Sequence, residues 1–232
     1  MMPLKKIIKK LIMNDALPVR YDIGLSGIGV GFEYFLQNGL LDTSESNIFE
    51  DFDDRMYRAV MYDPYYDLSL PGGLTGWGRY FIYRLNGFDN KHDKLHEAAT
   101  HIANELLLKI IKKEVPENEQ PDVYRFFYDL TKIAGYADKY SHLLHACNKW
   151  KCINNPDIHK IFSYMGNLQR LYACQNYFNV ELTEEIALEW KKWDNSGNYS
   201  LTDTGLLQGW TSHALLHATF SDRHNISWIN LL

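Results

Sequence analysis

The chain has 232 residues, of which 46% are hydrophobic and 14% aromatic, and its formal net charge is −5. This length and composition are typical of one folded domain and exclude a disordered chain. The acidic balance argues against a nucleic-acid partner, because such binding relies on clustered Lys and Arg side chains.

Residues 1–20 are predicted to contain a short amphipathic helix. Apolar residues recur there at the spacing of one helix face, with lysines between them: Leu4, Ile7, Ile8, Leu11 and Ile12 against Lys5, Lys6, Lys9 and Lys10. A helix that packs or covers a partner is favoured over one that lies on a membrane surface. The lysines interrupt the apolar run too early for a signal peptide, and no later segment is long enough to span a membrane.

A glycine-rich pattern then occurs twice. Residues 24–40 are GLSGIGVGFEYFLQNGL and residues 72–88 are GGLTGWGRYFIYRLNGF, and a shift of 49 residues aligns Gly24, Gly27 and Gly29 with Gly73, Gly76 and Gly78. Residues 205–220, GLLQGWTSHALLHATF, form a weaker third copy. Glycine costs roughly 1 kcal/mol inside a helix, so we expect these glycines where backbones approach closely. A phosphate-binding loop is not favoured, because no strand precedes them.

Strongly helical segments lie between and after these copies. They cover residues 44–61, 91–114, 122–135, 139–152, 156–178 and 183–193, and Pro116 and Pro121 bracket a predicted surface loop. No segment alternates with the period of a strand. The sequence therefore predicts an all-α fold of helix pairs, which either stack as a solenoid or close into a ring.

The cysteine content indicates the compartment. Cys147, Cys152 and Cys174 make an odd number without the spacing of a disulfide framework. This usage is typical of a reducing environment, so a cytoplasmic location is expected.

The two glycine copies, together with the terminal GLLQGW and SWINLL segments, resemble the lanthionine synthetase C-like family, the cyclases of lanthipeptide biosynthesis. The resemblance covers residues 22–232. It implies an α/α toroid, in which an inner ring of helices, each opened by a glycine-rich segment, is surrounded by an outer ring. On this basis residues 1–232 are expected to form a single domain, with helix-hairpin repeats over residues 21–232.

The resemblance also implies a chemistry that this sequence departs from. Enzymes of the family hold one zinc ion through two cysteines and a histidine, and the zinc activates a peptide thiol for addition to a dehydroamino acid. The Trp-Cys-x-Gly and Cys-His-Gly segments that supply these ligands do not occur here, and Tyr164 and Met165 would stand at one ligand pair. About five helix pairs can be counted instead of the family's seven, so the ring is expected to be open, reduced or completed by a partner.

Three hypotheses about function follow. The favoured one is a non-catalytic member of the family, which binds a peptide or serves as an accessory to a peptide-modifying enzyme, without a cofactor. The second is an active zinc-dependent, thioether-forming cyclase with a relocated metal site, for which His142, His145, Cys147 and Cys174 are the candidate ligands.

The third hypothesis is a carbohydrate-active α/α toroid that uses Asp63 and Asp67 as paired acids. These acids lie with two tyrosines in DPYYDLSLPGG, directly before the second glycine copy. For the peptide-binding hypothesis the candidate residues are Tyr66, Asp67, Trp77, His213 and His217. The two histidines are one helical turn apart, which is a fragment of a metal site at most.

Overall fold

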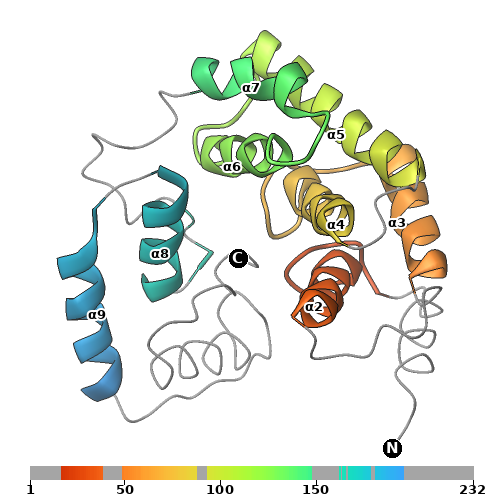
Figure 1. Ribbon diagram of the computed structural model, residues 1–232. Coiled ribbons are helices and arrows are strands. Elements are labelled where there is room, and N and C mark those ends of the chain that lie inside the picture. The colour runs from red at the N-terminus through yellow and green to blue at the C-terminus, as the bar shows by residue number, and fades with distance from the viewer. Residues whose placement is uncertain are drawn as a thin grey trace, which may run out of the picture. The chain divides into compact units, whose positions relative to one another are not determined.

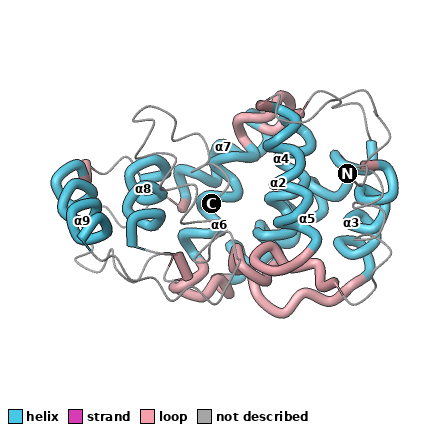
Figure 2. The backbone as a smooth tube through the Cα atoms, turned by 90° about the horizontal axis from the view of Figure 1, so that it is seen from below, coloured by secondary structure: helices cyan, strands magenta, loops and turns pink. Residues whose placement is uncertain are grey.

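The computed structural model describes residues 17–38, 49–87, 93–147, 162, 164–165, 167–178 and 181–195 (Figure 1). These residues contain eight α-helices and no strand, and Figure 2 shows the helices joined by loops. The prediction of an all-α fold is therefore confirmed for the described part of the chain. The predicted N-terminal helix and the third glycine copy lie outside it.

The chain divides into two compact units, Met1–His145 and Ala146–Leu232. Each unit is described by itself. The expectation of a single domain over residues 1–232 stays a prediction.

In the first unit, alternate helices belong to two layers. The inner layer consists of α2 (Leu25–Gln37), α4 (Leu74–Asn86) and α6 (Gln120–Leu130), in which α4 packs against both α2 and α6. The outer layer contains α3 (Glu50–Tyr62) and α5 (Asp93–Lys112), which pack against each other (Figure 1). The inner helices α2 and α4 are thus each followed along the chain by an outer helix.

The central inner helix, α4, is buried along most of its length. It packs against α5, whose inward face carries small and branched residues that are all fully buried: Leu95, Ala98, Ala99, Ile102, Ala103 and Leu106. The spacing of these residues places them on one side of the helix, and three alanines allow the two helices to approach closely. The outer helix thereby covers the inner one.

The predicted apolar face of α3 is confirmed where the structure describes it. Phe49, Phe52, Met56 and Val60 are buried, and the predicted Ile48 lies outside the described residues. The side chains of this face pack toward the inner layer, where the ring of Phe52 lies 5.4 Å from that of Tyr80.

The end of the first unit and the second unit contain three further helices. α7 (Ala137–Ala146) ends at the boundary between the units, and α8 (Asn167–Phe178) packs against α9 (Thr183–Asn195) in the second. The Trp190 indole N–H donates a hydrogen bond of 2.9 Å to the Tyr172 hydroxyl, which joins α9 to α8.

Candidate functional site

Two inner helices begin in the same way. α2 and α4 start after Gly24 and Gly73, whose backbones are extended, and no side chain caps either helix. Instead the first helical N–H donates to a carbonyl seven residues earlier: Leu25 to Pro18 at 2.9 Å and Leu74 to Asp67 at 3.0 Å. The preceding loop therefore supplies the hydrogen-bond acceptor that a capping side chain normally provides.

Glycine is required one turn later because the loop backbone lies directly on the helix. A Cβ atom on Gly27 would lie 1.9 Å from the Tyr21 carbonyl oxygen, and one on Gly76 would lie 2.0 Å from the Leu70 carbonyl oxygen. In both cases the obstructing carbonyl is six residues upstream. The expected close approach of backbones is confirmed, but at these two glycines the partner is the chain's own preceding loop and not a neighbouring helix that converges on an axis.

The last aligned pair of glycines faces aromatic rings instead. A Cβ atom on Gly29 would lie 2.4 Å from the ring of Tyr80, and one on Gly78 would lie 2.3 Å from the ring of Phe126. Tyr80 and Phe126 each belong to the next inner helix along the chain. Each glycine thus leaves room for an aromatic side chain of the following helix pair.

Hydrogen bonds connect the loops that precede the inner helices. The Pro71 carbonyl accepts from the N–H groups of Tyr21 and Asp22, at 2.9 and 3.1 Å. The Ser26 hydroxyl donates to the Gly76 carbonyl, which joins α2 to α4. The glycine-start end, defined here as residues 17–24, 63–73 and 117–122, is therefore a continuous hydrogen-bonded surface layer.

Two acids at the start of α6 complete this layer. Glu119 accepts a hydrogen bond of 3.0 Å from the Leu68 N–H, and Asp122 accepts one of 2.9 Å from the Leu70 N–H. The sequence predicted a surface loop at residues 117–120, but Glu119 is only 9% exposed. Its buried position depends on residues 51 positions away, which local sequence does not reveal.

The pKa of Glu119 gives a pH prediction. Burial raises this pKa, the Leu68 N–H opposes the shift, and the charge of Asp67 adds to it. A carboxyl group whose pKa is higher in the folded than in the unfolded state stabilises the fold at pH values below the unfolded-state pKa. This stabilisation is lost as the pH rises through the folded-state pKa. We expect Glu119→Gln to flatten the dependence of melting temperature on pH over that window, while its carbonyl still accepts from Leu68.

At neutral pH this substitution is expected to shift the melting temperature by no more than roughly 2 °C, upward. Glu114→Gln is the matched control, because the Lys109 hydrogen bond lowers the pKa of Glu114 at the protein surface. Glu114 contributes stability above its unfolded pKa and loses it as pH falls, so the two variants should change the pH profile with opposite sign. Identical profiles would contradict the role assigned to Glu119.

The sequence-predicted residues of this region lie in different environments. Tyr66 is 92% exposed and Asp63 is exposed, whereas the Asp67 carboxylate accepts hydrogen bonds from the Ser69 N–H and hydroxyl at 2.9 and 2.6 Å. Trp77 is only 5% exposed, and its indole N–H has no hydrogen-bond partner among the residues that the structure describes. Tyr66 is thus available to a partner, while Asp67 holds a turn and Trp77 lies in the core.

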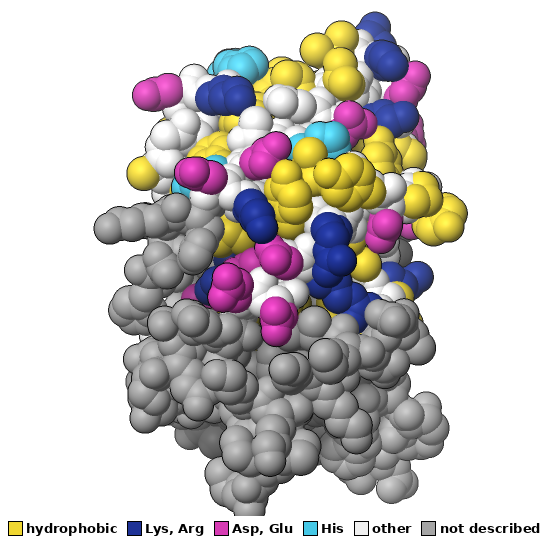
Figure 3. All heavy atoms as spheres, turned by 90° about the vertical axis from the view of Figure 1, so that its right-hand side faces the viewer, with side chains coloured by type: hydrophobic (Ala, Val, Ile, Leu, Met, Phe, Trp, Pro, Cys, Tyr) yellow, Lys and Arg dark blue, Asp and Glu magenta, His cyan; other side chains and the backbone are white. Residues whose placement is uncertain are grey.

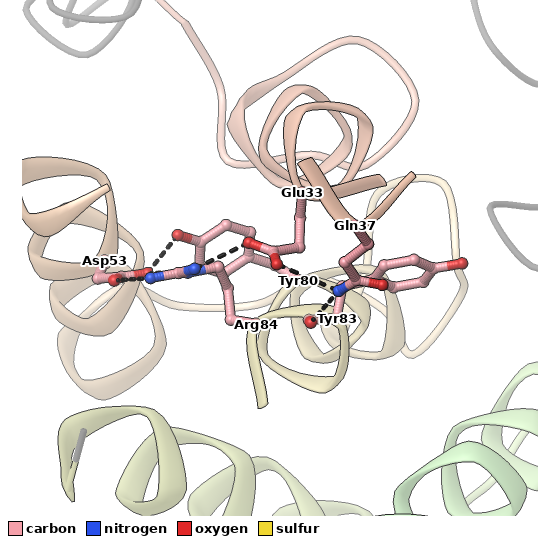
Figure 4. Close-up of polar contacts among 6 residues, drawn as sticks. All are labelled: Glu33, Gln37, Asp53, Tyr80, Tyr83 and Arg84. Carbon is pink, nitrogen blue, oxygen red and sulfur yellow. Dashed lines mark hydrogen bonds and ion pairs between the residues drawn. The ribbon is translucent and has the colours of Figure 1, made fainter. Parts of the chain in front are cut away.

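A second polar arrangement, the Arg84 cluster, joins α2, α3 and α4. It consists of Glu33, Asp53, Tyr80 and Arg84, all buried. The guanidinium of Arg84 binds Asp53 in bidentate fashion, at 3.0 and 2.8 Å, and binds Glu33 at 2.8 Å (Figure 4). The Tyr80 hydroxyl donates to Asp53, and Gln37 donates to Glu33 at 3.1 Å.

These contacts shift two pKa values in the cluster. Burial alone lowers the pKa of Arg84, but the hydrogen bond to Asp53 and the surrounding negative charge outweigh it, so the pKa is raised. Burial and the Asp53 charge raise the pKa of Tyr80 well above its ordinary value. Arg84 is therefore a fixed cation and Tyr80 a fixed hydrogen-bond donor, which makes the cluster a clamp between three helices and not a proton-transfer group.

A further buried ion pair connects α4 to α6. Arg79 binds Asp129, and the charges of Arg125 and Lys132 also act on this carboxylate. Burial raises the pKa of Asp129, but the three cations outweigh burial and lower it. The inner layer is thus held by one charged contact on each side of α4. The sequence does not predict a functional role for Arg79, Asp129, Arg125 or Lys132.

The candidate metal ligands are spread over both units and the undescribed part of the chain. His142 and His145 are exposed on α7, Cys147 and Cys174 are buried in the second unit, and His213 and His217 lie outside the described residues. Within the described ranges, no three His, Cys, Asp or Glu side chains are arranged to hold a metal ion. In the same part of the chain, no helix is long and apolar enough to cross a bilayer.

Comparison of the chain with protein-family models, with curated proteins and with solved structures gives no significant match.

Proposed function

We propose that this chain is a lanthionine synthetase C-like α/α toroid protein that binds a peptide for a modifying enzyme and does not itself catalyse thioether formation. The observation that carries the proposal is the repeated glycine-led start of α2 and α4, with a carbonyl six residues upstream against Gly27 and Gly76. Alternating inner and outer helices support the same architecture. The resemblance in sequence links both features to the family.

The non-catalytic part of the proposal rests on the missing ligand segments. Thiol addition to a dehydroamino acid needs a thiolate, which the family's zinc provides by lowering the pKa of the thiol. Met165 is buried and Tyr164 is half-buried at the positions where the family's Cys-His pair would stand. A thioether and a phenol at these positions do not replace a thiolate and an imidazole as zinc ligands.

The peptide-binding part rests on two exposed aromatic residues at and just after the end of α3. Tyr62 and Tyr66 are exposed on either side of Asp63, next to the glycine-start end. Tyrosine is enriched at protein interfaces, because it combines a large apolar ring with a polar group. The hydrogen bonds of Asp67, Glu119 and Pro71 hold the backbone of this segment. A partner would therefore meet an already ordered surface.

The test uses the full chain and a set of fluorescein-labelled peptides of about twenty residues, each with one cysteine and one dehydroalanine, a length that matches a standard interface. We expect saturable anisotropy changes with at least one peptide, and free thiol content, measured by iodoacetamide alkylation, that stays constant with added zinc. Thiol loss that depends on zinc and on the protein would establish an active cyclase instead. The absence of binding to every peptide would overturn the proposal.

Matched variants locate the binding surface. Tyr66→Ala is expected to weaken binding by roughly tenfold, the usual effect of truncating an aromatic residue at an interface. Ile111→Ala, on α5, removes another strongly exposed apolar side chain and should leave the affinity unchanged. Equal effects of the two variants would mean that the labelled peptides bind by non-specific hydrophobic contact. Trp77 is unsuitable for this test, because its substitution would act through core packing.

A further inference from the structure

One face of α2 is left partly exposed. The side chains that contact α3 and α4 are buried on one side of α2, whereas the opposite side carries Ile28, Gly31, Phe32 and Phe35. Phe35 is 43% exposed, and no described residue comes within 4 Å of a Cβ atom built on Gly31. This stripe, Ile28 to Phe35, is spaced as one helix face and is apolar throughout.

The repeat shows what covers such a face. Adding 49 to the stripe gives Trp77, Tyr80, Phe81 and Arg84 on α4, all of which are buried. The preceding outer helix, α3, contacts that face of α4, because Tyr80 and Arg84 both bind Asp53 and Phe52 contacts Tyr80. α2 also contacts it, through Glu33 and Gly29. The α2 stripe is therefore the surface on which an outer helix one repeat earlier would lie.

A segment with the matching pattern stands one repeat before α3. Subtracting 49 from Glu50–Tyr62 gives residues 1–13, MMPLKKIIKKLIM. α3 buries five of its residues. Four of the corresponding residues in this segment are apolar, namely Pro3, Leu4, Ile7 and Leu11. The fifth is Lys10, and a lysine can pack its long stem against apolar surface. The exposed Arg58 of α3 corresponds to Lys9.

Both residues of the Arg84–Asp53 ion pair in the second repeat correspond to apolar residues in the first repeat. Arg84 corresponds to Phe35 and its partner Asp53 corresponds to Leu4, so the ion pair between α4 and α3 becomes an apolar pair in the first repeat. A charged residue replaced on only one side would leave an unpaired buried charge, which is costly. The paired replacement indicates that residues 4 and 35 occupy one contact.

We propose that residues 1–13 are the outer helix of the first repeat and dock on the Ile28–Phe35 stripe of α2, with Leu4 against Phe35. Arg55 supports the path of the chain, because its guanidinium donates a hydrogen bond of 3.0 Å to the Leu17 carbonyl and holds the end of the connecting loop beside α3. In this arrangement the apolar face of the segment is used within the chain, and Lys5, Lys6 and Lys9 lie on its opposite side.

The test is a crosslink in the full chain between cysteines placed at the proposed contact. The Leu4→Cys and Phe35→Cys double variant is treated at high dilution with a short bismaleimide, and only linked peptides that contain both positions are counted. The control pair is Lys9→Cys with Phe35→Cys, because Lys9 lies on the opposite face of the segment. We expect an intramolecular yield on the order of tenfold higher for the Leu4 pair, as proximity raises effective concentration.

Other occupants of the stripe predict other products. Equal yields from the two pairs would overturn the proposed register, and a product that links two chains would assign the stripe to a second copy. Protection of both cysteines only when anionic phospholipid vesicles are added would assign the segment to a membrane surface. No linked peptide from either pair would overturn the docking itself.

A second measurement does not depend on crosslinking geometry. The rate of maleimide labelling at Phe35→Cys is compared after Leu4→Glu with Ile7→Glu and after Lys5→Glu with Lys9→Glu. Charges on the apolar face of the segment should release it from α2 and raise the labelling rate severalfold, whereas charges on its polar face should not. Equal labelling rates in the two backgrounds would contradict the proposal.

Discussion

Replacing Arg84 with methionine is expected to lower the free energy of unfolding by about 3–5 kcal/mol, because it leaves the buried carboxylates of Glu33 and Asp53 without their cation. The Arg84 cluster connects three helices, so its loss would loosen the contacts of α4 with both α2 and α3. The Tyr80 hydroxyl and Gln37 satisfy some of the carboxylate oxygens, but neither supplies positive charge. Urea denaturation followed by circular dichroism measures the change.

Two comparisons separate this electrostatic effect from loss of side-chain packing. Arg58→Met removes an exposed arginine on α3 and is expected to change stability by less than about 0.5 kcal/mol. Adding Glu33→Gln and Asp53→Asn to Arg84→Met removes the uncompensated charge, so the triple variant should regain part of the lost stability. If Arg84→Met alone were as stable as the wild-type chain, the cluster would not be a clamp.

Arg84→Lys is also expected to be poorly tolerated. The guanidinium uses Nε and both Nη groups, on two carboxylates that come from different helices. A lysine ammonium is a single point charge and cannot bridge both partners in this geometry. The Arg84 guanidinium also lies over the ring of Phe49, 4.6 Å from the ring centroid, a position that suits a planar cation.

The sequence predicted the helices well because their signals are local. The apolar spacing of α3 identified its buried face, and the glycines identified the starts of α2 and α4. Gly27 and Gly76, which the 49-residue shift aligns in the sequence, make equivalent backbone contacts in the structure. The sequence alone does not show that these glycines face the preceding loop and the next inner helix.

The polar contacts were not predictable because they are not local. Glu33, Asp53 and Arg84 lie on three helices, and each alone is typical of a solvent-facing position. The buried Glu119 was likewise assigned to a surface loop, since its partner Leu68 is distant in sequence. The aromatic side chain of Trp77 makes it a candidate for peptide binding, but this residue is buried. Burial of a charged or aromatic residue depends on tertiary partners that periodicity does not identify.

The side-chain contacts on the outward face of the first unit were also not predictable from the sequence. In Figure 3, hydrophobic side chains on this face lie among basic, acidic and histidine side chains, without a single charge type dominating. Tyr57 and Tyr65 each donate a hydrogen bond to a glutamate of α5, Glu97 and Glu105 respectively. Such mixed contacts stabilise the outer layer, and they carry no pattern that a sequence alone would single out as a site.

Gly76→Ala and Gly27→Ala are expected to destabilise the chain by about 3 kcal/mol each, because overpacking against backbone cannot be relieved by rotating a side chain. The added Cβ atoms would lie 2.0 Å from the Leu70 carbonyl oxygen and 1.9 Å from that of Tyr21, so the loop or the helix must move. Moving the loop at Gly76 would also disturb the hydrogen bonds that Pro71 accepts from Tyr21 and Asp22. Thermal and urea denaturation of each variant measure the loss.

Gly31→Ala is the matched control, since it is the same substitution on the same helix as Gly27. No described residue lies within 4 Å of the added Cβ atom, and alanine has the higher helix propensity, so this variant should be more stable by about 0.5–1 kcal/mol. Opposite signs for two glycines four residues apart would separate close packing from helix propensity. If both variants were stabilised, the glycines would not be needed for the loop to lie against the helix, and the structural basis for the repeated helix start would fail.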